Sequence, residues 1–386
     1  MQTRETGADP AYGAGQEGWP ARRPVVGEPA PPFADVRRIA VLRGGGLGDL
    51  LFALPAAEAL AAAYPGAELT LLGMPLHAAL LDGRPPFARV ELLPVRPGVR
   101  DGVEDPARTA AFVQRMREQR FDLAVQVHGG GRNSNPFLLA LGATHTVGTR
   151  TEDAAALERT IPYAYYQHEV LRALEVVGLA GAAPVDLEPR LRLTEAEQQV
   201  RTGARTRPPT VVLHPGATDP RRRWPAAAFA ALATDLARDG CTVVVVGDAA
   251  EAALAEQVVA GVAPEMAGRV RSTAGKASLA ELVRLLLTAS LVVANDSGPR
   301  HLAAAVGVPT VGIYWFGNAL NAGAFSRGRH RLQLAWTTSC PVCGADATSL
   351  TAPRCAHDDS FVAEVPVAAV LADARALLAQ PAGAVG

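Results

Sequence analysis

The richest candidate for a binding site in this chain of 386 residues is the segment 295–301, Asn-Asp-Ser-Gly-Pro-Arg-His. It follows the apolar run 291–294, which predicts a buried strand, and it precedes a predicted short helix. Ser297 and Gly298 would free the backbone to wrap an anion at the helix N-terminus. The segment therefore predicts a phosphate site at the carboxyl end of a strand.

Two side chains of this segment would interact with a phosphate in opposite ways. His301 would lie one turn into the helix, where a ring N–H could donate a hydrogen bond to a phosphate oxygen. Asp296 would repel a phosphate, so we interpret it as a cap or as an acceptor for sugar hydroxyls or backbone N–H groups.

A second candidate is the glycine-rich segment 43–49, Arg-Gly-Gly-Gly-Leu-Gly-Asp, directly after a predicted strand at 38–42. Glycines such as Gly46 and Gly48 would let a substrate come close to the main chain. Asp49 opens the following helix and would point into a cleft, where a carboxylate could serve as a general base. It could equally serve only as a helix cap. The segment does not fit the dinucleotide-binding fingerprint.

Further candidates stand at other strand ends. Three consecutive arginines, with Arg222 in the middle, could hold a diphosphate or form a solvated basic loop. Lys276 and Ala277, before one predicted helix, and Glu251, after the predicted strand 241–246, could contact a nucleoside. As single side chains they could instead be solvent-exposed. The turn 128–132 contributes Gly130 and Arg132, which we assign to the acceptor side.

Three of the four cysteines gather near the end of the chain, as Cys340, Cys343 and Cys355, with His357 close by. The C-P-x-C-G spacing is that of a zinc knuckle, whereas the C-x-H spacing that follows is not a standard one. These four side chains could hold a structural zinc, or they could be free groups in a loop that covers the cleft.

The elements around these segments predict an α/β protein. Short apolar runs alternate with amphipathic stretches from residue 36 onward, which is typical of parallel strands joined by helices. The predicted elements include a helical stretch over 158–178 and a final strand over 309–314. The polar stretch 201–209 suggests a boundary between two doubly wound domains, whose ligands should lie beyond the carboxyl ends of the strands, in the cleft between them.

The predicted divisions are a disordered tail (1–34), an N-terminal acceptor domain (35–205), a C-terminal nucleotide-sugar domain (206–365) and a C-terminal helix and tail (366–386). A net charge of −1 offers no global field for nucleic acid. No signal peptide or membrane span is recognised, so we expect a cytoplasmic protein that could associate peripherally with a membrane.

Taken together, the segments resemble family 9 glycosyltransferases, the group that contains the ADP-heptose:lipopolysaccharide heptosyltransferases. The resemblance covers about residues 36 to 320. It rests on Arg43…Leu47-Gly48-Asp49…Pro55, His214-Pro215-Gly216-Ala217, Arg223-Trp224-Pro225, Gly275-Lys276-Ala277-Ser278-Leu279, Asn295-Asp296-Ser297-Gly298-Pro299-Arg300-His301-Leu302 and Gly307-Val308-Pro309. The long N-terminal stretch and the cysteine-rich stretch 340–357 depart from the best-known members.

The resemblance implies a GT-B fold made of two Rossmann-like domains that face a central cleft. It also implies inverting transfer of a sugar, heptose or similar, from a nucleotide-diphosphate sugar, ADP-linked, to a glycan or glycolipid of the cell envelope, with no cofactor for catalysis. Asp49 matches the family's general base, Arg222 replaces a lysine that contacts the donor phosphates, and His301 matches a histidine that contacts phosphate. Glu251 falls near the family's ribose-binding glutamate.

Two rival functions remain open at this point. One is a nucleotide-sugar epimerase on the same fold, which would need further acid–base residues deep in the donor cleft. The other is a non-catalytic protein that binds sugar nucleotides, against which the combination of Asp49, Arg222 and His301 argues.

Overall fold

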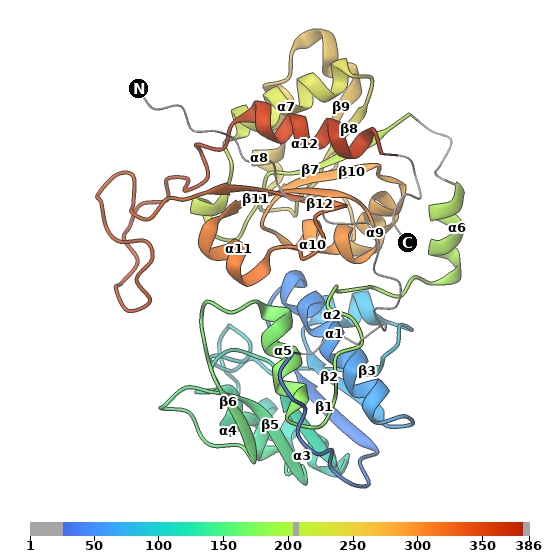
Figure 1. Ribbon diagram of the computed structural model, residues 1–386, viewed down its shortest axis with the longest axis vertical. Helices are drawn as coiled ribbons and strands as arrows, with labels where there is room; N and C mark the ends of the chain where they lie inside the picture. The colour runs from blue at the N-terminus through green and yellow to red at the C-terminus, as the bar shows by residue number, and fades with distance from the viewer. Residues whose placement is uncertain (1–25, 204–207, 381–386) are drawn as a thin grey trace, which may run out of the picture.

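Two six-stranded sheets form the two lobes of the protein (Figure 1). The computed structural model describes residues 26–203 and 208–380. The strands of the first sheet are β1 (Arg38–Leu42), β2 (Glu68–Gly73), β3 (Phe87–Leu92), β4 (Leu123–Gln126), β5 (His145–Arg150) and β6 (Arg159–Pro162). Those of the second sheet are β7 (Thr210–His214), β8 (Thr242–Val245), β9 (Val270–Ser272), β10 (Leu291–Asn295), β11 (Thr310–Trp315) and β12 (His330–Ala335).

The two sheets share one topology. The first has the order β3-β2-β1-β4-β5-β6 and the second the order β12-β11-β10-β7-β8-β9, with every pair parallel. Each strand order reverses at one point, between β1 and β4 in the first sheet and between β7 and β10 in the second. Such switch points are where doubly wound sheets bind ligands. The predicted α/β class with two Rossmann-like domains is confirmed.

Helices cover both faces of each sheet. Those that follow strands of the first sheet are α1 (Leu47–Ala63), α2 (Pro75–Leu81), α3 (Pro106–Glu118), α4 (Ser134–Ala140) and α5 (Glu169–Gly178). The later helices are α6 (Glu195–Gly203), the 3₁₀ turn η2 (Pro220–Arg222), α7 (Ala226–Arg238), α8 (Ala252–Ala260), the 3₁₀ turn η3 (Pro264–Arg269), α9 (Leu279–Thr288), α10 (Gly298–Ala305), α11 (Phe316–Ala322) and α12 (Val367–Leu378).

Helix α1 explains how the lobes are held together. Its residues are apolar on nearly all sides, and Leu50, Leu51 and Leu60 are fully buried. A helix with such a pattern must be covered all round. It packs on α5 along its length and against α10 of the second lobe near its N-terminal end, so one continuous hydrophobic core extends from the first sheet to the second.

The segment between the sheets also contacts both lobes. The Leu191 N–H donates to Ala305 O at 3.0 Å, and helix α6 packs against α9 of the second lobe. Glu197 on α6 forms an ion pair with Arg84 of the first lobe at 2.6 Å. The predicted boundary between residues 205 and 206 falls in the stretch 204–207, which lies outside the described residues.

Part of each predicted tail packs against the folded protein. Residues 1–25 of the predicted N-terminal tail and residues 381–386 lie outside the described part of the chain. Within 26–34, Phe33 is buried and stacks on His145, and the Ala30 N–H donates to Gly178 O. At the other end, α12 packs on α7 and on the second sheet, so it belongs to the second domain.

Two predicted elements were wrong. The stretch 158–178 is not one helix, because its first residues form β6, which pairs with β5, and the helix begins only at Glu169. The strand β11 is not the last, since β12 pairs beside it as an edge strand whose side chains are mostly half-exposed. Among the described residues no helix combines the length and apolar character needed to cross a membrane.

Candidate functional site

A cavity of about 590 Å³ lies between the lobes at the switch points of both sheets. Most of the predicted site residues line it: Gly46, Gly48, Asp49, Arg222, Glu251, Ala277, Asp296, Ser297, Gly298 and His301. Three do not. Lys276 is exposed beside the lining residue Ala277. Gly130 and Arg132 follow β4, and Arg132 pairs with Asp153 at 3.2 Å, away from this cavity.

The helices α1 and α10 begin opposite each other across the cavity. A Cβ added to Gly298 would lie 3.0 Å from Leu47 Cβ, and one added to Gly48 would lie 3.2 Å from the His301 ring. Both glycines are therefore needed for the close approach of the lobes, rather than for a positive φ angle. The N-termini of two helices, which attract anions, thus meet at one place.

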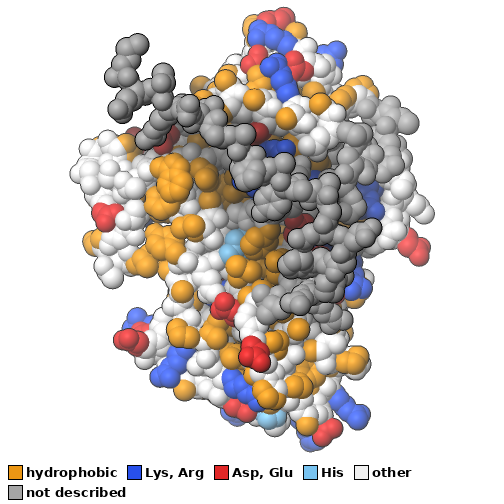
Figure 2. Space-filling view, viewed as in Figure 1, with side chains coloured by type: hydrophobic (Ala, Val, Ile, Leu, Met, Phe, Trp, Pro, Cys, Tyr) orange, Lys and Arg blue, Asp and Glu red, His pale blue; other side chains and the backbone are white. Residues whose placement is uncertain are grey.

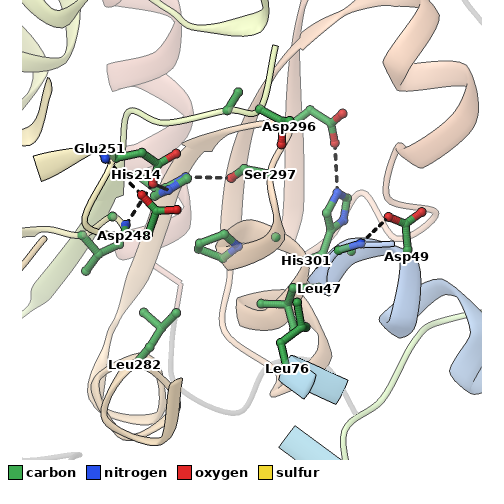
Figure 3. A pocket seen from close by; sticks show the side chains of 18 of the residues that line it. Leu47, Asp49, Leu76, His214, Asp248, Glu251, Leu282, Asp296, Ser297 and His301 are labelled. Carbon is green, nitrogen blue, oxygen red and sulfur yellow. Dashed lines mark hydrogen bonds and ion pairs between the residues drawn. The ribbon is translucent and has the colours of Figure 1, made fainter. Parts of the chain in front are cut away.

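His214, at the carboxyl end of β7, links two predicted site residues (Figure 3). Its Nδ1 lies 2.9 Å from Ser297 Oγ and its Nε2 lies 3.0 Å from Glu251 Oε2. The carboxylate can only accept, so the imidazole carries its proton on Nε2 and the Ser297 hydroxyl donates to Nδ1. The sequence motif contained His214, but this bridging role was missed because the two partners are distant in the chain.

Glu251 is fixed at one end of the cavity. Burial would raise the pKa of its carboxyl group, but the interaction with His214, the hydrogen bond from the Asp248 N–H and the charge of Arg223 together outweigh burial, so the pKa is lowered overall. The Asp248 N–H donates to Glu251 Oε2 at 3.1 Å. Gly216 leaves the room that the carboxylate occupies, since a Cβ there would lie 1.8 Å from Glu251 Oε1.

A chain of hydrogen bonds connects two arginines through His301 and Asp296. Arg300 Nη2 donates to His301 Nδ1 at 2.8 Å, so His301 Nε2 donates to Asp296 Oδ1 at 2.9 Å. Arg222 Nη1 completes the chain by donating to Asp296 Oδ2 at 3.2 Å. Both ring nitrogens of His301 are thus engaged within the protein, whereas the sequence predicted a free N–H for a phosphate.

In this series of hydrogen bonds, burial makes His301 neutral, whereas Asp296 stays ionised because its partners offset its burial. Burial and the nearby Arg300 lower the pKa of His301 to about 4, so the ring is neutral at pH 7. Burial would raise the pKa of Asp296, but the hydrogen bond from His301 and the charge of Arg222 lower it overall. Asp296 is therefore an ionised acceptor, but its partners are the side chains of His301 and Arg222 rather than the backbone N–H groups or sugar hydroxyls that the sequence suggested.

The loop that carries Arg222 is anchored by the next aromatic residue. Trp224 is buried, its backbone N–H donates to Asn295 Oδ1 at 3.0 Å, and its indole N–H donates to Val365 O at 2.9 Å. Asn295 is the last residue of β10 and the first of the segment 295–301. Its hydrogen bond with Trp224 therefore holds the turn that carries Arg222 against that segment. Arg222 keeps about a quarter of its side chain exposed toward the cavity.

Asp49 caps α1, which is one of the two roles that the sequence left open, and its side chain also faces the cavity. Its Oδ2 accepts from the Gly46 N–H at 2.8 Å, which caps α1, and its Oδ1 accepts from Arg43 at 2.6 Å. Nearly half of the Asp49 side chain (46%) remains exposed, and the residue lines the cavity. The cap is therefore real, and it leaves the carboxylate accessible to a ligand.

Glu169, the first residue of α5, is a second carboxylate that the first lobe contributes to the cavity wall, and sequence reasoning missed it. It lies 3.1 Å from Arg43 and also pairs with Arg172. Two guanidinium groups hold this carboxylate, and only 19% of its side chain is exposed. The sequence offered one signal for this residue, namely an acidic side chain in the first turn of a helix, and that signal indicates a helix start rather than a binding site.

The structure brings the predicted metal ligands together. The Sγ atoms of Cys340, Cys343 and Cys355 and a ring nitrogen of His357 all lie within 4.8 Å of one another. His357 Nδ1 is buried and has no hydrogen-bond partner among the described residues. Hydrogen bonds from the backbone of Cys343 and Val342 lower the pKa of the Cys340 thiol to about 7. These residues belong to a long loop after β12 that extends beside the second lobe (Figure 1).

Comparison with known proteins gives consistent results. The model of glycosyltransferase family 9 (heptosyltransferase) matches residues 109–335. Lipopolysaccharide heptosyltransferase 2 of Salmonella typhimurium is 26% identical over 72% of this chain and 82% of its own length. Lipopolysaccharide heptosyltransferase 1 of Pseudomonas aeruginosa is 28% identical over 79% of this chain and 86% of its own. The solved ADP-heptose heptosyltransferase II of E. coli superposes with a TM-score of 0.67 at 21% identity, over 89% of this chain and 98% of that one. This likeness confirms the predicted GT-B fold.

Proposed function

Because the chain belongs to glycosyltransferase family 9 and is a glycosyltransferase, we propose that it transfers heptose from ADP-heptose to a glycan or glycolipid acceptor. Relatives from three bacteria are named as heptosyltransferases, and one is described as using ADP-heptose. The observation that carries the proposal is the cavity that is lined both by Asp49 of the first lobe and by the segment 295–301 of the second, where we expect the diphosphate to bind. A glycolipid acceptor would place the enzyme at the inner face of a membrane.

The polarity of the cavity suggests how the donor lies. Glu251 and Ala277 line one end. The hydrogen bonds from His214 and Asp248 both go to Glu251 Oε2, so Oε1 would be left to accept from ribose hydroxyls. The backbone N–H groups at the start of α10 and the Arg222 guanidinium would bind the diphosphate. The sugar would then extend toward Asp49. His301 acts in this arrangement by holding Asp296, which in turn orients Arg222.

The reaction we propose is a direct displacement. Asp49 accepts the proton of the acceptor hydroxyl as its oxygen forms a bond to the anomeric carbon from the face opposite the diphosphate. The bond from that carbon to the phosphate oxygen breaks, and its electron pair leaves with ADP. Arg222 and the N-terminus of α10 stabilise the charge that develops on the leaving diphosphate. The configuration at the anomeric carbon is inverted.

Binding and turnover assays test this function. We expect ADP to raise the melting temperature more than UDP or GDP does, and ADP-heptose incubated with heptose-free lipopolysaccharide to give ADP and a heptosylated product of inverted configuration. An epimerase would instead return a changed nucleotide sugar with no release of ADP. Binding of ADP without any turnover of ADP-heptose would leave only a nucleotide-sugar-binding protein.

We further propose that the cysteine cluster holds a structural metal ion, with zinc as the metal that best fits three thiolates and an imidazole. Ligand atoms around a tetrahedral zinc lie about 3.8 Å apart, which is compatible with the observed spacing within 4.8 Å. The buried His357 Nδ1 without a partner is explained if it faces a metal. The ion would tie the two ends of the long loop together and take no part in the chemistry.

Metal analysis tests this assignment. Protein purified without a histidine tag should contain about one zinc per chain, and Cys343→Ser should lose it and unfold the loop at a lower temperature. Cys241→Ser is the matched control, because Cys241 is buried in the core of the second lobe and belongs to no cluster. Iron in place of zinc would change the identity of the metal, and protein free of any metal with unchanged stability in chelator would refute the site.

A further inference from the structure

A second cavity, of about 410 Å³, lies beside the first and is walled by both lobes and by the cysteine-bearing loop. Its volume falls within the range of about 300–1,000 Å³ that small-molecule sites occupy. Arg222 and Asn318 line both cavities, so the second opens onto the place where we position the donor diphosphate and sugar. No part of the donor arrangement proposed above uses it.

Four aromatic side chains, two from each lobe, line this cavity. Tyr165 and Tyr166, just before α5 of the first lobe, have their rings 5.0 Å apart at 89° and are 47% and 37% exposed. Trp315 and Phe361 of the second lobe complete the aromatic wall. Exposed tyrosines present an apolar ring together with a hydroxyl that can hydrogen-bond. This combination suits a ligand that has both apolar faces and hydroxyl groups.

The long loop supplies much of the remaining lining. Ala345, Asp346, Ser349 and Leu350 line the cavity, and the Tyr166 hydroxyl donates to Thr348 O of this loop at 3.2 Å. This hydrogen bond joins the first lobe to the loop directly. Figure 2 shows hydrophobic side chains gathered where the loop leaves the second lobe, a region in which Trp336 is 68% exposed.

Every arginine that lines the cavity is already paired with a carboxylate. Arg221 pairs with Asp219 at 2.6 Å, and Arg354 pairs with Asp358. Arg222 pairs with Asp296. A paired guanidinium group attracts a free anion less strongly but can still donate through its other N–H groups, and Asp219 and Asp346 supply acceptors. A wall that both donates and accepts suits hydroxyl groups.

We infer that this second cavity is a saccharide subsite, which holds the sugar end of the acceptor while one of its hydroxyls reaches Asp49. The inference rests on the proposed transfer reaction and adds to it where the acceptor binds and what it is made of. The loop that carries the cysteine cluster then acts as a wall of the acceptor site. Asn318, shared by the two cavities, lies between the donor sugar and the acceptor sugar.

Binding of neutral sugars to ADP-saturated protein tests the subsite, because ADP fills the first cavity. The probes are the methyl glycoside of heptose and maltotriose, followed by saturation-transfer NMR titration. At least one should bind, with a Kd that ADP leaves unchanged. Changing both tyrosines, as Tyr165→Ala with Tyr166→Ala, should weaken that binding about tenfold, and Arg354→Ala should weaken it less. The exposed Arg108, which pairs with Asp105 on the first lobe, gives the matched control Arg108→Ala.

The outcomes separate this inference from the proposed function. Sugar binding that ADP abolishes, or that survives the double tyrosine change, would overturn the subsite. So would failure of both probes to bind. In each of these cases binding of ADP and release of ADP from ADP-heptose would still stand as the test of the transfer reaction, since neither requires the second cavity. Retained ADP binding in each variant confirms that the protein is folded.

Discussion

Asp49→Asn is expected to lower kcat by about 10²–10⁴, the contribution of a well-placed general base, while the affinity for ADP stays within twofold of the wild type. An asparagine oxygen can still accept from the Gly46 N–H and cap α1, but the amide cannot take a proton from the acceptor hydroxyl. Arg43 keeps Glu169 and two backbone carbonyl groups as partners. We therefore expect the melting temperature to change by only a few degrees.

Steady-state kinetics with ADP-heptose and a saturating acceptor provide the measurement. Glu58→Gln is the control on the same helix, because Glu58 pairs with Arg192 at 2.8 Å outside the cavity, and its kcat should match that of the wild type. Turnover of Asp49→Asn within a few-fold of the wild type would reduce Asp49 to a helix cap. Glu169, the other carboxylate that the first lobe contributes to the wall, would then become the candidate for the base.

Arg222→Ala should reduce kcat by about 10²–10³, the typical loss when one donor to a developing charge is removed, and it should also weaken ADP binding. The truncation has a second consequence, because Asp296 loses its partner at Oδ2 and keeps only His301. A buried carboxylate with one partner fewer repels the incoming diphosphate more strongly. The affinity for the donor diphosphate should therefore fall by more than the loss of one hydrogen bond alone would cause.

Arg222→Lys provides the comparison for that variant. A lysine ammonium can still pair with Asp296 and approach a phosphate oxygen, so kcat should stay within about tenfold of the wild type. ADP titration by calorimetry and initial-rate kinetics measure the two steps separately. Equal activity of Arg222→Ala and the wild type would show that the N-terminus of α10 alone supports the departure of the diphosphate.

The sequence placed the elements of the segment 291–301 correctly because its signals are local. A strand, a glycine-rich turn and a helix start stand next to one another in the segment 291–301, and local periodicity is enough to order them. The same holds for 38–49. The cavity residues that follow from these turns therefore lie where the sequence expected them.

The features that were missed depend on contacts between distant segments. His214 meets Glu251 and Ser297 only after β7, β8 and β10 have paired, so its bridging role has no local signature. The engagement of both His301 nitrogens likewise requires the burial of Arg300. The edge strand β12 was overlooked because its alternation of polar and apolar residues, Arg331-Leu332-Gln333-Leu334, covers only four residues, the shortest run from which a strand is inferred.

The meeting of α1 and α10 at Leu47 and Gly298 has an electrostatic consequence for the movement of the lobes. Each helix carries a partial positive charge at its N-terminus, and two like charges face each other across the cleft. Water screens this repulsion only in part in a closed cleft. In the proposed reaction a bound nucleoside diphosphate would supply the missing counter-charge, so the donor would strengthen the contact between the lobes. Release of ADP would remove that counter-charge and weaken the contact again.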